Sequence, residues 1–182
     1  MHVAIYCGSQ IGKNEAYKEA AIEVGERLAQ AGHTIVYGGS KIGLMGLMAN
    51  AALQNGGAII GVMPEHLQKR ELAHVELTEL HIVDTMHTRK AKMIDLSNAL
   101  LALPGGCGTM DEYFEAFTWA QIGLHDKPVI LYNVDGFYDA LIEHFKRMMD
   151  EGFIRDEQHK LFHVVTSIEQ LEALLTNYSP VM

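Results

Sequence analysis

The sequence predicts an α/β protein, a Rossmann-like doubly wound parallel sheet with helices on both faces. Short runs rich in Val, Ile, Leu and Tyr alternate with helical patterns from one end of the chain to the other. These runs are apolar along their whole length, which is typical of strands covered on both faces. The 182 residues are enough to bury a full hydrophobic core, and no repeat or low-complexity tract divides them. We therefore expect residues 1–182 to form a single domain.

The individual elements follow from the spacing of apolar residues. The first strand is expected over 2–7, and apolar residues at helical spacing, closed by Gly32, predict a helix over 15–31. The other strands are expected, in chain order, over 33–38, 58–63, 79–84, 99–104, 128–133 and 161–166. The other helices are expected over 43–55, 86–97, 109–123, 137–151 and 168–177. Residues 64–78 show no clear periodicity, and loops of that length are often functional.

The composition argues against several kinds of partner. The net charge of −9 argues against nucleic acids, because proteins that bind them carry basic surfaces that neutralise phosphates. No run approaches the roughly 18 apolar residues of a membrane span, so we expect no membrane contact. The N-terminal stretch shows no basic leader, and Cys7 and Cys107 show no pairing pattern. We expect reduced thiols and a cytoplasmic location.

Three predicted strands are followed by glycine-rich loops, "CGSQIG", "YGGSKIGLMG" and "PGGCGT". Ligands of such folds bind beyond the carboxyl ends of the strands, so three glycine loops at that edge suggest a nucleotide-like site. The spacing Gly8-x-x-x-Gly12 differs from the dinucleotide fingerprint, and no acid ends the second strand, which argues against NAD. The stretch "GSQIGKN" is one residue too short for a P-loop and has Asn14 where Ser or Thr binds magnesium, which argues against ATP hydrolysis.

Metal and thiol chemistry have little support in the sequence. His159-x-x-x-His163 is the one closely spaced histidine pair, and it has no carboxylate at a recognisable spacing, so we expect no metal. A nucleophilic Cys107 would need a histidine that the sequence does not place beside it. We interpret Cys107 as a small residue in a tight loop.

Two acids follow the third glycine loop in the stretch "LPGGCGTMDE". Thr109-x-x-Glu112 matches a capping box, in which the two side chains satisfy backbone donors at the start of a helix. Acids in a first turn also complement the helix dipole. This interpretation explains Asp111 and Glu112 without any chemistry.

A second interpretation starts from Arg89 and Lys90, which lie near the start of the predicted helix 86–97 and therefore at the same edge of the sheet. These cations and the amides of residues 105–109 would surround a phosphate. An acid beside that phosphate would lie where the ribose of a nucleoside monophosphate meets its base. Breaking that bond builds positive charge on the ribose, which a carboxylate stabilises, or the carboxylate deprotonates the attacking water. The spacing alone leaves both interpretations open.

The same residues carry a resemblance to a known family. The motif P-G-G-x-G-T-x-x-E is present in full as Pro104–Glu112, and M-H-x-R-K is present as Met86–Lys90. Similarity extends through "YCGS", "YGGSKIGLMG", "TWAQIGLHDKPV", "NVDGFYD" and "EGFIR", over nearly the entire chain. The sequence thus resembles the LONELY GUY family of cytokinin-activating phosphoribohydrolases. The resemblance implies hydrolysis of a cytokinin riboside 5′-monophosphate, and of AMP, to free base and ribose 5-phosphate.

By matching positions, the resemblance implies that Arg89 and Glu112 are catalytic. Arginine does not lose its proton in proteins, so Arg89 would orient groups or stabilise charge while Glu112 acts as the base. The resemblance also implies substrate contacts from Glu71, Lys90, Gly105, Gly106, Cys107, Gly108, Thr109, Met110, Asp111 and Thr118. It implies a homodimer, and neither a metal nor an organic cofactor.

The sequence departs from the family pattern at Ser40 and Lys41, where many relatives have Gly-Ser, and at Gln10, where many have Ser. These positions lie outside both motifs and bear on ligand preference. The alternative function is a non-catalytic protein of the same fold that binds a nucleotide or a molybdenum cofactor. A carrier gains little from an acid beside the ribose, so the pair of Arg89 and Glu112 favours the enzyme. The label lysine decarboxylase, also applied to the family, has no support, because no lysine lies in a recognisable pyridoxal-phosphate context.

Overall fold

The computed structural model describes residues 1–68 and 73–178. The seven expected strands are present as β1 (His2–Tyr6), β2 (Thr34–Tyr37), β3 (Ile59–Pro64), β4 (Glu79–Val83), β5 (Ala99–Ala102), β6 (Val129–Tyr132) and β7 (Phe162–Val165). All neighbouring strands pair in parallel, in the order β4-β3-β2-β1-β5-β6-β7. The predicted doubly wound parallel sheet is therefore confirmed.

The helices between the strands match the expected ones to within two residues at each end. They are α1 (Glu15–Gln30), α2 (Gly43–Gln54), α4 (Met86–Asp95), α5 (Cys107–Gln121), α6 (Asp139–Asp150) and α7 (Ile168–Asn177). The sequence did not predict the short α3 (Glu65–Gln68) or the 3-10 turns η1 (Val134–Gly136) and η2 (Asp156–Leu161). No described helix is long and apolar enough to cross a membrane.

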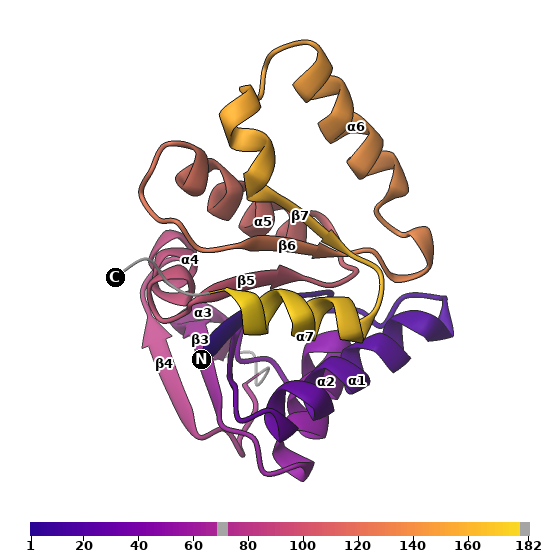
Figure 1. Cartoon of the computed structure of the whole chain (residues 1–182). Coiled ribbons are helices and arrows are strands. Elements are labelled where there is room, and N and C mark those ends of the chain that lie inside the picture. The colour runs from indigo at the N-terminus through magenta and orange to yellow at the C-terminus, as the bar shows by residue number, and fades with distance from the viewer. Residues whose placement is uncertain (69–72, 179–182) are drawn as a thin grey trace.

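Helices cover both faces of the sheet (Figure 1), and an apolar core lies on each face. Successive residues of a strand point to opposite faces, so Val3 and Ile5 of β1 pack with α1, α2 and α7. Ala4 and Tyr6 pack on the other face with α4, α5 and α6. This alternation explains why the central strands are apolar along their whole length, as the sequence predicted. The edge strand β4 departs from that prediction, since it carries Glu79 and His81 and is only partly buried.

The order of the strands creates a switch point between β1 and β5. The chain winds outward from β1 to β4 on one side and then returns to β5 on the other side of β1. The loops that follow these two strands meet, with the amide of Gly8 donating to the carbonyl of Pro104 at 3.0 Å. In open α/β sheets this crevice is where ligands bind.

Close packing of α1 against α2 depends on Gly25. A Cβ at this position would overlap the carbonyl oxygen of Met48 and lie 3.2 Å from Cβ of Ala51. We expect Gly25→Ala to lower the free energy of unfolding by about 1–3 kcal/mol, because the two helices would have to move apart. Urea denaturation measures this change. Gly108→Ala is the matched control, since nothing lies within 4 Å of the added methyl group, and an unchanged midpoint for Gly25→Ala would contradict the tight contact.

Candidate active site

A cleft of about 520 Å³ opens at the carboxyl edge of the sheet beside the switch point. Its volume falls in the usual range for sites that bind small molecules. It is lined by Ile5, Cys7, Ser9, Gly38, Ser40, Ile42, Met45, Met63, Leu67, Met86, Arg89, Gly106, Cys107, Gly108, Thr109, Asp111 and Glu112. The cleft therefore combines all three glycine loops with both sequence motifs.

Helix α4 carries Arg89 into this cleft. The helix begins at the carboxyl edge because it follows β4, and its N-cap residue Thr85 accepts a hydrogen bond from the amide of Thr88 at 3.0 Å. The side chain of Arg89 is 11% exposed, and its Nε donates to the carbonyl of Val62 at 3.1 Å. Gly38 leaves room for the guanidinium, because a Cβ there would overlap Nη2 of Arg89. The arginine is thus held by β3 and its own helix, beside the loop that follows β2.

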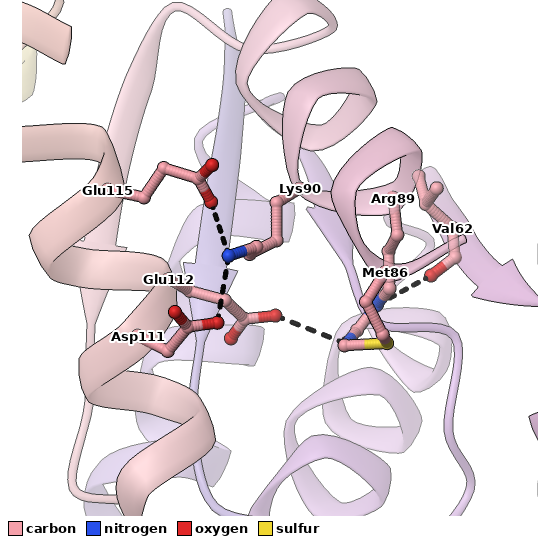
Figure 2. A network of polar contacts seen from close by, with 7 residues as sticks. All are labelled: Val62, Met86, Arg89, Lys90, Asp111, Glu112 and Glu115. Carbon is pink, nitrogen blue, oxygen red and sulfur yellow. Dashed lines mark hydrogen bonds and ion pairs between the residues drawn. The ribbon is translucent and has the colours of Figure 1, made fainter.

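Helix α5 carries Glu112 to the same place. Its N-cap is Gly106, in an extended conformation (φ −96°, ψ −158°). Thr109 is then the third residue of the helix and Glu112 lies in its second turn, so the capping-box interpretation and the expected start at residue 109 are wrong. The carboxylate of Glu112 instead lies with Oε1 3.3 Å from Nη1 of Arg89, and its side chain is 9% exposed (Figure 2).

Burial is the largest influence on the acidity of Glu112. It raises the pKa of Glu112 because an ionised carboxylate loses its hydration. The positive charges of Arg89 and Lys90 oppose this shift, and the negative charges of Asp111 and Glu115 add to it. The net effect is a higher pKa for Glu112. No hydrogen bond to Oε1 is found within the described residues. The carboxylate can therefore accept a proton from a ligand, and it does so at a pH above the ordinary glutamate range.

Lys90 contacts carboxylates rather than lining the cleft. Its ammonium lies 2.6 Å from Oε2 of Glu115 and 2.9 Å from Oδ2 of Asp111 (Figure 2). The sequence-based hypothesis placed Lys90 beside a phosphate, and in the structure its charge is already matched by these acids. Glu115 was missed from the sequence, although its spacing of three residues from Glu112 puts both on neighbouring faces of one helix.

Most of the other predicted contact residues lie at the start of α5. Gly106, Cys107, Gly108 and Thr109 all line the cleft. The first three are exposed, and Thr109 is buried against Gly105. Gly105 itself lines an adjacent cavity of about 230 Å³, which shares Ser9 and Gly106 with the cleft.

Two further predicted residues, Met110 and Thr118, do not line the cleft of the single chain. Met110 packs against the core that contains Tyr113, and Thr118 is exposed on α5. Glu71 lies outside the described residues. Among the described residues, no three His, Cys, Asp or Glu side chains cluster as metal ligands would.

Several cleft residues were not singled out from the sequence. Met45, Met63 and Leu67 form apolar walls of the cleft. Of the three residues that depart from the family pattern, Gln10, Ser40 and Lys41, only Ser40 lines it. Met63 stands near the carboxyl end of β3, so its position at a strand end was the available signal. Leu67 lies in the aperiodic segment 64–78, whose length was the available signal, but nothing in the sequence distinguishes it from its neighbours there.

Known proteins resemble this chain at the level of sequence. A family model described as "Possible lysine decarboxylase" matches residues 45–175. The chain is 43% identical to the probable cytokinin riboside 5′-monophosphate phosphoribohydrolase LOGL2 of Oryza sativa subsp. japonica, over 98% of this chain and 73% of that protein. It is 42% identical to the cytokinin riboside 5′-monophosphate phosphoribohydrolase LOG4 of Arabidopsis thaliana, over 98% of this chain and 83% of that protein.

Solved structures resemble the chain in fold. The molybdenum cofactor carrier protein of Chlamydomonas reinhardtii superposes with a TM-score of 0.71 at 22% identity, over 97% of this chain and 98% of that one. The molybdenum cofactor binding protein of Rippkaea orientalis gives a TM-score of 0.70 at 17% identity, over 96% and 94%. At such identities the likeness shows the fold alone. The family model matches residues 45–175, and the identity to the two phosphoribohydrolases is 42–43% over 98% of the chain. This protein therefore belongs to the LONELY GUY family.

Proposed function

We propose that the protein hydrolyses the N-glycosidic bond of cytokinin riboside 5′-monophosphates and of AMP, releasing the free base and ribose 5-phosphate. One observation carries the proposal, the buried carboxylate of Glu112 paired with Arg89 in a cleft that begins at a glycine loop. The similarity to proteins named phosphoribohydrolases supports it over nearly the whole chain.

The glycine loop suits the phosphate of such a substrate. Gly106 and Gly108 carry no side chain that would keep an anion from the first amides of α5, and the positive end of the helix dipole favours negative charge there. Glu112 lies six residues beyond Gly106, about 9 Å along the helix axis at 1.5 Å per residue. A ribose 5-phosphate bound at the loop would therefore bring its C1′ atom toward the carboxylate.

The chemistry then follows from two charged groups. As the bond between C1′ and the base nitrogen breaks, positive charge develops on the ribose and is stabilised by the nearby carboxylate. Water adds its oxygen to C1′ and passes a proton to Glu112, while the base leaves with the bonding electrons. The base takes up a proton from solvent, and Glu112 releases its proton to solvent, so that the carboxylate is restored. Arg89 stays protonated throughout and fixes the position of Glu112.

The description of the family model as a possible lysine decarboxylase has no support at this site. A decarboxylase of the pyridoxal-phosphate type needs a lysine amine free to form a Schiff base. Lys90 is the lysine of the sequence motif at the cleft, and its ammonium is held between Asp111 and Glu115. The carboxylate and arginine of the cleft suit hydrolysis of a glycosidic bond instead.

Incubation of the protein with AMP and with isopentenyladenosine 5′-monophosphate tests the proposal directly. Chromatography is expected to show free adenine or isopentenyladenine together with an equal amount of ribose 5-phosphate. The corresponding nucleosides, which lack the phosphate, are the control and should react far more slowly. Binding of either nucleotide without release of base would refute hydrolysis and favour a non-catalytic binding protein.

We further propose that the protein is a cytoplasmic homodimer. Thr118 lies on an exposed face of α5, and the exposed apolar side chains of Phe114, Ile122 and Leu124 lie on the same helix or just beyond it. A substrate contact by Thr118, which the family resemblance implies, requires this face to pack against a second copy. Light scattering is expected to give twice the chain mass of 20.2 kDa. A monomeric mass at micromolar concentration would contradict the proposal.

A further inference from the structure

Two ion pairs lie side by side between α4 and α5. Arg89 and Lys90 are neighbours on α4, and their partners Glu112 and Glu115 are three residues apart on α5 (Figure 2). The first pair faces the cleft, since both of its residues line it. Neither residue of the second pair lines the cleft. The second pair is therefore adjacent to the reacting groups without touching the substrate's space.

Within the second pair, Glu115 is the stronger partner of Lys90. The side chain of Lys90 is 9% exposed, that of Glu115 22% and that of Asp111 61%. Solvent screens the more exposed acid, and the distance of 2.6 Å to Glu115 is shorter than the 2.9 Å to Asp111. Burial lowers the pKa of Lys90, but hydrogen bonds and charge from Glu115 and Asp111 outweigh it, so the ammonium stays charged.

This arrangement puts three carboxylates within two turns of α5. Glu112 is flanked by Asp111 and Glu115, and both flanking acids share the ammonium of Lys90. The charged and titratable groups that act on or respond to Glu112 come from β1 and the residue after it, from α4 and from α5, and are Tyr6, Cys7, Arg89, Lys90, Asp111 and Glu115. Of these, Lys90 is the cation that is paired directly with the two like charges beside the reacting carboxylate.

We propose that Lys90 and Glu115 form a positioning pair that sets the charge of Glu112 without contacting the substrate. The inference rests on the proposed function, since it gives the pair its role in hydrolysis. It differs from the role implied by the family motif, in which Lys90 contacts the substrate. Like charges beside a carboxylate favour its neutral form, and opposite charges favour its ionised form.

The pair should therefore affect the acid limb of the pH profile in two opposite directions. Lys90→Met leaves Asp111 and Glu115 without their cation, so Glu112 takes up its proton at higher pH and the limb moves to higher pH. Glu115→Gln removes one like charge and leaves Lys90 charged, so the limb moves to lower pH. The double variant should return the limb toward its position in the parent. A merely structural pair would lower activity in both variants without moving the limb.

The experiment measures kcat and KM for AMP between pH 4 and pH 9 in the parent and in these variants, with Lys92→Met on the same helix as the matched control. On the acid limb, kcat/KM is expected to fall roughly three- to tenfold in Lys90→Met and to rise by a similar factor in Glu115→Gln. The KM on the plateau should stay within about twofold of the parent. If Lys90 held the phosphate, its loss would instead raise KM by about tenfold or more at every pH.

Titration of ¹³C-labelled glutamate carboxyl groups by NMR separates this inference from the proposed function. The signal of Glu112 is assigned by its disappearance in Glu112→Gln. If the parent releases no base, hydrolysis is refuted, and the titration of Glu112 still has to move in opposite directions in the two variants. If the parent turns over but neither limb nor titration moves, the positioning pair is refuted while hydrolysis stands. Glu115→Gln keeps the side-chain shape and carries the test even if Lys90→Met fails to fold.

Discussion

Glu112→Gln is expected to lower turnover of AMP by about 10²- to 10⁴-fold, the usual contribution of a general base. The amide has nearly the shape of the carboxylate, so the packing around it is kept. It carries no charge for the developing positive charge on the ribose and has no basic oxygen for the proton of the attacking water. The side chain is 9% exposed, so bulk solvent is a poor substitute in this position.

Two further measurements test whether Glu112→Gln affects the chemical step alone. Calorimetric titration with AMP should show binding at least as tight as in the parent, because the variant removes a negative charge from the surroundings of a phosphate. Asp111→Asn is the matched control, since Asp111 lines the same cleft but is 61% exposed and paired with Lys90. Its turnover should fall by less than about fivefold, as expected of a well-solvated acid. Full activity of Glu112→Gln would mean that another group takes the proton.

The fold could be predicted from the sequence because each signal was local. Apolar runs of four to six residues and helical spacing between them placed all seven strands and six of the helices. The short α3 and the two 3-10 segments were missed because one or two turns of helix are too brief to show a period. The start of α5 was predicted two residues too late, because Thr109 and Glu112 have the spacing of a capping box. In the structure the N-cap of α5 is Gly106.

The site was predicted only in part, because it depends on contacts between residues that are far apart in the sequence. A helix that follows β4 must begin at the carboxyl edge of the sheet, so the approach of Arg89 to the glycine loop followed from the topology. The direction of each side chain did not follow. Arg89 and Lys90 are adjacent in sequence, yet only the first lines the cleft, because successive residues of a helix point about 100° apart. The role of Glu115 became visible only when its distance to Lys90 was known.

Arg89→Met is expected to reduce kcat/KM at neutral pH by about 10²- to 10³-fold, and by a different route from that of Glu112→Gln. Burial already raises the pKa of Glu112, and Arg89 is the cation that most opposes the rise. Without the guanidinium the buried carboxyl keeps its proton at neutral pH and is no longer a base. Raising the pH should therefore recover part of the activity of Arg89→Met, whereas Glu112→Gln should stay inactive at every pH.

The same change predicts how stability depends on pH. A carboxyl whose pKa is higher in the folded chain than in the unfolded chain binds more protons when folded, so its contribution to stability is present at low pH and lost as pH rises through the folded pKa. The free energy of unfolding of Arg89→Met should thus fall more steeply with pH than that of the parent, by about 3–5 kcal/mol once Glu112 ionises without a partner. Urea denaturation between pH 5 and pH 9 measures this slope. Arg89→Lys keeps the positive charge and should restore most of the parent's slope. The double variant Arg89→Met/Glu112→Gln should lose the extra slope altogether, because the buried carboxylate of residue 112 is no longer there to ionise. A steep slope that persists in the double variant would assign the effect to some other group and remove the argument that Arg89 keeps Glu112 ionised.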